Sequence, residues 1–122
     1  MIFSGKQKIE KFPGTLLVKS KLKYIQVSIK GNSMSPTFKN GDFVIFEKNN
    51  GANLKINDIV LFNHPFRKNK KIIKRIKKIM QNGCIFVEGD NRHESEDSHH
   101  FGTINKNQVI ATFGGKKLDE QL

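Results

Sequence analysis

The sequence predicts an all-β protein, built as a small, partly closed barrel or sandwich. Segments rich in β-branched and aromatic residues recur at short intervals along the chain. Asn-Gly pairs at 40–41, 50–51 and 82–83 mark tight turns between them. No stretch shows the periodicity of a convincing amphipathic helix. Short strands joined by glycine-marked turns are typical of small sandwiches and barrels.

The expected strands are separated by turn residues. After a lead-in at 1–20, they cover residues 24–29, 42–47, 58–62, 71–80, 84–88 and 108–113. The Asn-Gly pair at 82–83 predicts a hairpin between the fourth and fifth strands. The polar segment 90–103 is expected to be irregular, and the lysine-rich end at 115–122 is expected to fray.

Length and composition indicate a single domain over residues 1–122. Cys84 has no second cysteine to pair with, and its apolar neighbours predict a buried core position. The net charge of +11 allows nucleic acid, anionic lipid or an acidic protein as partner, although a solvated shell of lysines is the simpler explanation. No apolar run reaches the roughly 18 to 20 residues that span a bilayer, so no transmembrane segment is expected.

The first segment that carries chemistry is Gly31-Asn32-Ser33-Met34-Ser35-Pro36-Thr37. Pro36 forbids a central strand, so the segment is expected to form a turn that enters a new element. A serine in such a turn can present its hydroxyl on rigid backbone, where nearby N–H groups can receive an oxyanion. Ser33 is therefore a candidate nucleophile, although serine and proline are common in ordinary turns.

The second segment is Ile72-Ile73-Lys74-Arg75-Ile76. Side chains alternate along a strand, so Lys74 shares one face with two isoleucines while Arg75 lies on the other. If the face of Lys74 is buried, loss of hydration lowers the pKa of its amine and favours the neutral form. A packed β core can do this and a solvated surface cannot. Lys74 is therefore a candidate general base.

The third segment, residues 88–102, mixes acidic side chains with His93, His99 and His100. Such a mixture raises the possibility of a metal site. The spacing matches no closed zinc pattern, however, and acidic loops with histidines are frequent in proteins. Neither a metal nor another cofactor is expected.

Together the three segments resemble, in order, the sequence boxes of type I signal peptidases. The matching stretches are Ser33-Met34-Ser35-Pro36-Thr37 with Gly41-Asp42, then Lys74-Arg75, then Gly89-Asp90-Asn91 with Ser95 and Asp97-Ser98. The resemblance covers about residues 31–102. It implies an all-β catalytic domain with a serine–lysine dyad, which binds its substrate as an added strand and prefers small side chains before the cut.

Position by position, the resemblance implies a role for each matched residue. Ser33 corresponds to the nucleophile, Lys74 to the general base and Ser95 to the serine whose hydroxyl orients the lysine. The residues that hold the loops around this dyad correspond to Arg75, Asp90 and Asp97.

The sequence departs from the family pattern at two positions near the site. His99 stands where many members have arginine, which predicts a weaker and pH-dependent ion pair with Asp97. Gly31 stands where some members have a serine that donates to the oxyanion. The backbone N–H groups of Ser33 and Gly31 are therefore expected to stabilise the oxyanion.

A small relative without a membrane anchor most resembles the maturation protease of nickel-type superoxide dismutase, which removes an N-terminal extension. The expected function is a soluble, cytoplasmic serine endopeptidase whose partner is a protein precursor and not nucleic acid. One alternative is a signal peptidase that processes secretory preproteins. A self-cleaving repressor-type protease is disfavoured by the short stretch before Ser33. A basic β-barrel that binds nucleic acid through residues 67–78 would not explain why the three segments fit one template.

Overall fold

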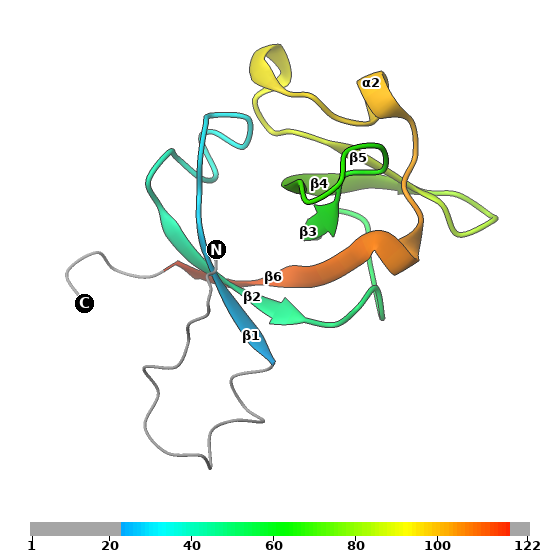
Figure 1. The fold of residues 1–122 in the computed structure, drawn as a ribbon, viewed down its shortest axis with the longest axis horizontal. Coiled ribbons are helices and arrows are strands. Elements are labelled where there is room, and N and C mark those ends of the chain that lie inside the picture. The colour runs from blue at the N-terminus through cyan, green and yellow to red at the C-terminus, as the bar shows by residue number, and fades with distance from the viewer. Residues whose placement is uncertain (1–22, 118–122) are drawn as a thin grey trace.

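The computed structural model describes residues 23–117, which form one antiparallel sheet of six strands (Figure 1). The strands are β1 (Tyr24–Ser28), β2 (Phe43–Lys48), β3 (Ile59–Asn63), β4 (Lys71–Ile79), β5 (Ile85–Glu88) and β6 (Val109–Lys117). Their order across the sheet is β1-β2-β6-β3-β4-β5, so the sheet stays open with β1 and β5 at its edges. The all-β prediction is confirmed. The lead-in expected at 1–20 lies outside the described residues.

Strand β6 links the two halves of the sheet, because it pairs with β2 on one side and with β3 on the other. It continues to Lys117, so the prediction that residues 115–117 fray is wrong; 118–122 lie outside the described residues. The pairing with β2 shifts register between Ile45 and Phe46, and Gly115 there has φ +91°. This β-bulge accommodates Gly114 and Gly115, so β6 continues to pair with β2 beyond them. The two glycines have no apolar side chains that would predict a strand from the sequence.

The β4–β5 hairpin forms at the Asn-Gly pair that predicted it. Gly83 has φ +91°, and the Met80 N–H donates to the Cys84 carbonyl at 2.8 Å. The side chain of Asn82 accepts from the Cys84 N–H at 2.9 Å, which closes the turn. Cys84 itself is half-buried and not a fully buried core residue, because it lies at the turn and not inside the strand.

Short helical segments follow β5 in the part of the chain that the structure describes. They are η2 (Arg92–Glu94), α2 (Ser98–Phe101) and η3 (Lys106–Gln108), in and just after the segment predicted to be irregular. Single turns such as these leave no periodicity to be recognised, and their caps are polar residues that also favour loops. Within residues 23–117, no helix has the length and apolar character needed to cross a bilayer.

The core lies on both faces of β3, whose residues from Ile59 to Phe62 are all buried. One cluster contains Ile72 and Ile76 of β4. The other contains Met34 and Phe38, from the loop between β1 and β2. The core therefore fixes both segments that carry the predicted dyad.

Candidate active site

The loop that carries Ser33 is anchored in the core by the residues that follow it. Met34 is 3% exposed and Phe38 is completely buried, with its ring edge-on to Phe113 at a centroid distance of 4.9 Å. The Phe38 N–H donates to the Met34 carbonyl at 2.9 Å, which closes a helical turn. Ser33 itself is only half-buried. The buried residues Met34 and Phe38 therefore form a rigid support that holds the Ser33 hydroxyl at a surface that a substrate can reach.

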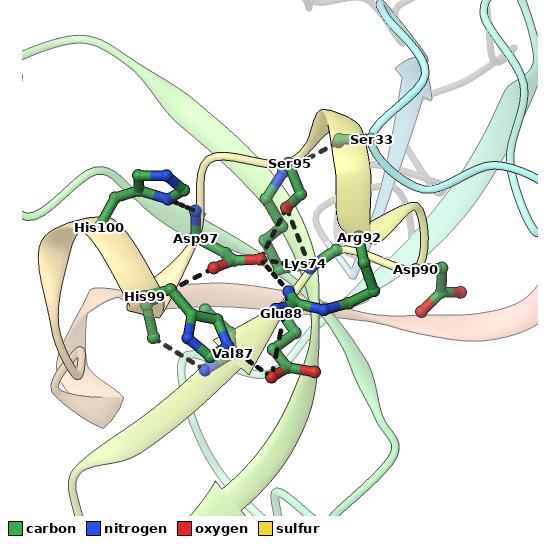
Figure 2. A network of polar contacts seen from close by, with 12 residues as sticks. Ser33, Lys74, Val87, Glu88, Asp90, Arg92, Ser95, Asp97, His99 and His100 are labelled. Carbon is green, nitrogen blue, oxygen red and sulfur yellow. Dashed lines mark hydrogen bonds and ion pairs between the residues drawn. The ribbon is translucent and has the colours of Figure 1, made fainter.

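Lys74 extends from β4 to the Ser33 hydroxyl. The distance from Lys74 Nζ to Ser33 Oγ is 2.9 Å, although the two residues are 41 positions apart in the chain (Figure 2). The predicted alternation is confirmed, since Ile72, Lys74 and Ile76 are buried on one face. Val60 of β3, which pairs with Lys74 in the sheet, is completely buried. Lys74 is therefore only 4% exposed, among apolar neighbours.

The surroundings of Lys74 favour its neutral form. Burial lowers the pKa of the amine, and this outweighs the opposing effect of the carboxylates of Asp97 and Glu96. Within the described residues, Ser33 Oγ is the hydrogen-bond partner of Nζ, whereas an ammonium group has three protons to donate. Once the amine is neutral, the hydroxyl can donate to its lone pair across the same 2.9 Å.

The backbone N–H of Ser33 is a candidate donor to an oxyanion. Within residues 23–117, the Ser33 N–H has no hydrogen-bond acceptor. The Gly31 N–H, in contrast, already donates to Asn40 Oδ1 at 2.8 Å. The expected contribution of Gly31 to an oxyanion site therefore does not fit this geometry, because its donor is used to close the loop. The arrangement leaves the N–H of Ser33 for that role.

Ser95 lies beside the dyad and forms hydrogen bonds to the residues behind it. Its hydroxyl donates to Asp97 Oδ2 at 2.8 Å and accepts from the Gly89 N–H at 3.1 Å. Within the described part of the chain, no hydrogen bond joins Ser95 to Lys74. Any influence of Ser95 on Lys74 would therefore act through the carboxylate of Asp97.

Asp97 is the buried acid at the centre of this network (Figure 2). Oδ2 accepts from the Gly89 N–H, the Ser95 hydroxyl and Arg92 Nη1, and Oδ1 accepts from the His99 N–H. Burial alone would raise the pKa of Asp97, but these four donors outweigh it and hold the pKa below its ordinary value. The carboxylate is thus a fixed negative charge close to Lys74.

The expected ion pair between His99 and Asp97 does not form. Because Asp97 caps α2, it receives the backbone N–H of His99 and not the imidazole. The imidazole instead lies 2.7 Å from Glu88 Oε2. The charged partner of Asp97 is Arg92, at 3.1 Å. Arg92 was not among the site residues predicted from the sequence, although it directly follows the matched Gly89-Asp90-Asn91 box.

On the opposite face of β4, Arg75 holds a second acid. It makes a bidentate pair with Asp90, in which Nε donates to Oδ1 and Nη2 to Oδ2, each at 2.8 Å. Asp90 also accepts from the Thr37 hydroxyl at 2.5 Å. Burial opposes ionisation of Asp90, but these donors lower its pKa overall. Arg75 and Asp90 therefore tie the Ser33 loop to β4, as expected of supporting residues.

Gly89 lies between Ser95 and the backbone of Ser33. A Cβ at this position would lie 2.6 Å from Ser95 Cβ and 2.7 Å from the Ser33 carbonyl oxygen. The Asn91 N–H donates to that same carbonyl at 2.9 Å. Only glycine fits between the loops, because any side chain would push Ser33 away from Ser95. The only signal for this in the sequence was the glycine in the matched box.

A search of residues 23–117 for metal ligands gives no group of three or more His, Cys, Asp or Glu side chains placed to hold an ion. The histidines near the site have other partners. His100 Nδ1 accepts from the Asp97 N–H at 3.3 Å, and His99 pairs with Glu88. What the arrangement offers is a hydroxyl next to a buried amine, a free backbone donor and a fixed carboxylate, which are the components of serine-type acyl transfer.

Comparison with known proteins agrees with this chemistry. The chain is 33% identical over 108 residues to the mitochondrial inner membrane protease subunit 2 of Saccharomyces cerevisiae, covering 67% of this chain and 61% of that protein. It is 61% identical over 28 residues to a signal peptidase I of Bacillus caldolyticus, covering 23% of this chain and 15% of that protein. The chain therefore spans less than two thirds of either relative.

These relatives confirm the expected likeness to proteases of the signal-peptidase type. The match to a family model is more extensive than either, since the model of the Peptidase S24-like family covers residues 4–112. That range includes the Ser33 loop, β4 and the segment 88–102. The chain belongs to the Peptidase S24-like family.

Proposed function

We propose that this protein is a serine endopeptidase that removes an N-terminal extension from a precursor protein, with Ser33 as nucleophile and Lys74 as general base. The observation that carries the proposal is the 2.9 Å contact between Lys74 Nζ and Ser33 Oγ inside an apolar setting. A lysine can serve as base near neutral pH only where its pKa is lowered, and burial lowers it here. The family match and the names of both relatives support the same chemistry.

In the proposed mechanism, Ser33 Oγ attacks the scissile carbonyl carbon while its proton passes to Lys74 Nζ. The carbonyl oxygen becomes an oxyanion and accepts from the Ser33 N–H. The ammonium of Lys74 then protonates the leaving amine, the peptide bond breaks and an acyl-enzyme remains. Water attacks this ester, giving its proton to Lys74. The new carboxyl end leaves as the proton returns to Ser33 Oγ.

We propose that the substrate binds as an extended strand along the edge of β1 that no other described strand occupies. This strand lies at the edge of the described sheet and leads directly into the Ser33 loop. The other edge, at β5, is covered: the Val87 N–H donates to Ser98 Oγ, and Ile85 pairs with Ile104. An added strand needs free backbone donors and acceptors, so β1 is the better edge.

Two classes of precursor suit this site. One is the precursor of nickel-type superoxide dismutase, a substrate that goes with a cytoplasmic location. The other is a secretory preprotein with small residues before the cut, and the name of the Bacillus relative favours this class. Both require the same dyad and differ in the sequence presented to β1.

The test is to incubate the purified chain with each precursor and to determine the new N-termini. Ser33→Ala is the control, because it removes the nucleophile and leaves the loop anchored by Met34 and Phe38. Cleavage of one precursor by the wild type alone identifies the substrate class. Equal cleavage by wild type and Ser33→Ala would remove Ser33 from the mechanism.

A further inference from the structure

Glu96 lies in the site loop, which is the segment 95–97 between η2 and α2, and it links this loop to the β3–β4 hairpin. The hairpin lies next to α2 (Figure 1). Its carboxylate faces three basic side chains from that hairpin: His64 Nε2 at 3.6 Å, Arg67 Nη2 at 3.8 Å and Lys70 Nζ at 3.8 Å. Glu96 lies between Ser95 and Asp97 in the sequence. A contact that fixes Glu96 therefore also restrains the two neighbours that form the network behind Lys74.

His64 directs one ring nitrogen at the Glu96 carboxylate. Its side chain is buried, and Nδ1 accepts the N–H groups of Phe66 and Arg67 at 3.0 and 3.1 Å. With Nδ1 used as an acceptor, the proton of the neutral ring must be on Nε2. Nε2 has no hydrogen-bond partner within the described residues and points at Glu96. The hairpin turn thus presents a fixed donor and two cations to one carboxylate.

The geometry points to Glu96 as a positioning residue. We propose that its contacts hold the Ser95–Asp97 segment against the loop between β3 and β4, and that the balance of charge between Glu96 and Lys70 sets the pH at which the Ser33–Lys74 pair becomes active. The proposal rests on the proposed function, in which Lys74 is the general base.

The charged groups around Lys74 come from two elements. The site loop contributes Asp97 and Glu96, and the hairpin contributes Lys70. Burial lowers the pKa of Lys74; the two carboxylates raise it, and Lys70 lowers it further. Around these groups, Arg92 pairs with Asp97, while His64 and Arg67 face Glu96. Glu96 and Lys70 therefore act on the same amine with opposite sign.

The test uses Glu96→Gln and Lys70→Gln. Glu96→Gln removes a negative charge and keeps an oxygen that can accept from His64, so the acidic limb of the activity profile should move to lower pH. Lys70→Gln removes a positive charge, so the limb should move to higher pH. At a pH on that limb, the two variants should differ from wild type by about twofold or more, in opposite directions. Both side chains are partly exposed, so neither substitution threatens the fold.

Arg67→Gln is the matched control, because Arg67 contacts Glu96 but is not among the groups that shift the pKa of Lys74, which are Asp97, Glu96 and Lys70 besides burial. It should leave the limb in place. A second measurement needs no substrate: NMR titration of the Lys74 side chain, assigned as the signal that disappears in Lys74→Ala. This titration should move in the same directions as the activity limb in both charge variants.

The outcomes separate the two proposals. If Lys74→Ala keeps full activity, the proposed function fails, whatever the limb does. If Lys74→Ala is inactive and neither charge variant moves the limb or the titration, the proposed function stands and the role of Glu96 is wrong. Shifts of the acidic limb in the same direction in both variants would also overturn the role of Glu96. The two substitutions remove opposite charges, so an electrostatic effect on Lys74 must move the limb in opposite directions, whereas loss of a structural contact need not.

Discussion

The two faces of β4 treat adjacent cations in opposite ways. Lys74 points into the core, where its ammonium form would have one hydrogen-bond acceptor among the described residues and where burial lowers its pKa. Arg75, one residue on, makes a bidentate pair with Asp90, and this hydrogen bonding raises its pKa. Burial on one face favours the neutral form of Lys74, whereas hydrogen bonds on the other face favour the charged form of Arg75.

The difference shows why the two residue types are not interchangeable. A lysine can lose its proton when it is desolvated, and becomes a base. An arginine stays charged, and the charge of Arg75 is balanced by the carboxylate of Asp90. The face of Lys74 supplies chemistry, and the face of Arg75 supplies mechanical support for the Ser33 loop through Asp90 and Thr37.

The largest expected effect is that of Lys74→Met. Removal of the base should lower the cleavage rate by about 10²- to 10⁴-fold, because general-base catalysis contributes effects of this size. The variant should fold and be at least as stable as wild type, since it replaces a poorly solvated amine with an apolar side chain. Near-normal turnover by this variant would end the distinction between the two faces.

The stability of Lys74→Met also has a predicted pH dependence. Between the lowered pKa of Lys74 and about 10.4, the unfolded chain binds the lysine proton and the folded chain does not. Wild-type stability therefore rises with pH across this window, and the advantage of Lys74→Met is greatest below it and disappears above it. Urea unfolding of both proteins over a pH series measures this, and a pH-independent difference would contradict a lowered pKa.

Gly89→Ala should have the next largest effect. The new Cβ would overlap Ser95 and the Ser33 carbonyl, so the nucleophile loop must move away from Lys74. Displacements of about 1 Å at a catalytic group cost on the order of 10²-fold in rate. Gly114→Ala is the matched control, because a Cβ there meets no atom within 4 Å. Equal rates for the two variants would show that the loops tolerate the shift.

Asp90→Ala tests the other face. It leaves Arg75 partly buried without its carboxylate, which should lower the free energy of unfolding by about 2 kcal/mol. The acidic limb of the activity profile should stay in place, since Asp90 does not contribute to the pKa of Lys74. Lys71→Gln, an exposed change on the same strand, is the control and should cost less than about 0.5 kcal/mol. Urea denaturation and a pH series measure both effects; a moved limb would mean that the two faces are coupled.

Ser95→Ala should have the smallest effect, a fall in rate of about tenfold, equivalent to one hydrogen bond. Asp97 loses one of its four donors and keeps three, so its carboxylate is held less firmly but stays in place. Ser98→Ala is the control. It removes the buried acceptor of the Val87 N–H, so it should lower the free energy of unfolding by about the value of one hydrogen bond without lowering the cleavage rate. If Ser95→Ala and Ser98→Ala have the same turnover, Ser95 has no part in orienting the dyad.

Much of the fold and of the dyad was predictable, because the signals are local. Strand alternation placed Lys74 with Ile72 and Ile76, and the Asn82-Gly83 pair located the hairpin. The extension of β6 beyond Phe113 was missed, since it depends on pairing with β2 and not on side-chain pattern. The single turn of α2 was too short to leave a pattern.

The sequence by itself determined which residue types stand at the turn and on the strand, because turn chemistry and the two-residue period act over a few positions. Only the tertiary structure decided their partners. Arg92, and not His99, pairs with Asp97, and the Gly31 N–H donates to the side chain of Asn40. Gly89 lies so close to Ser95 and to the Ser33 carbonyl that only glycine fits there. Such pairings depend on how distant segments close against the sheet, and a linear pattern does not encode those distances.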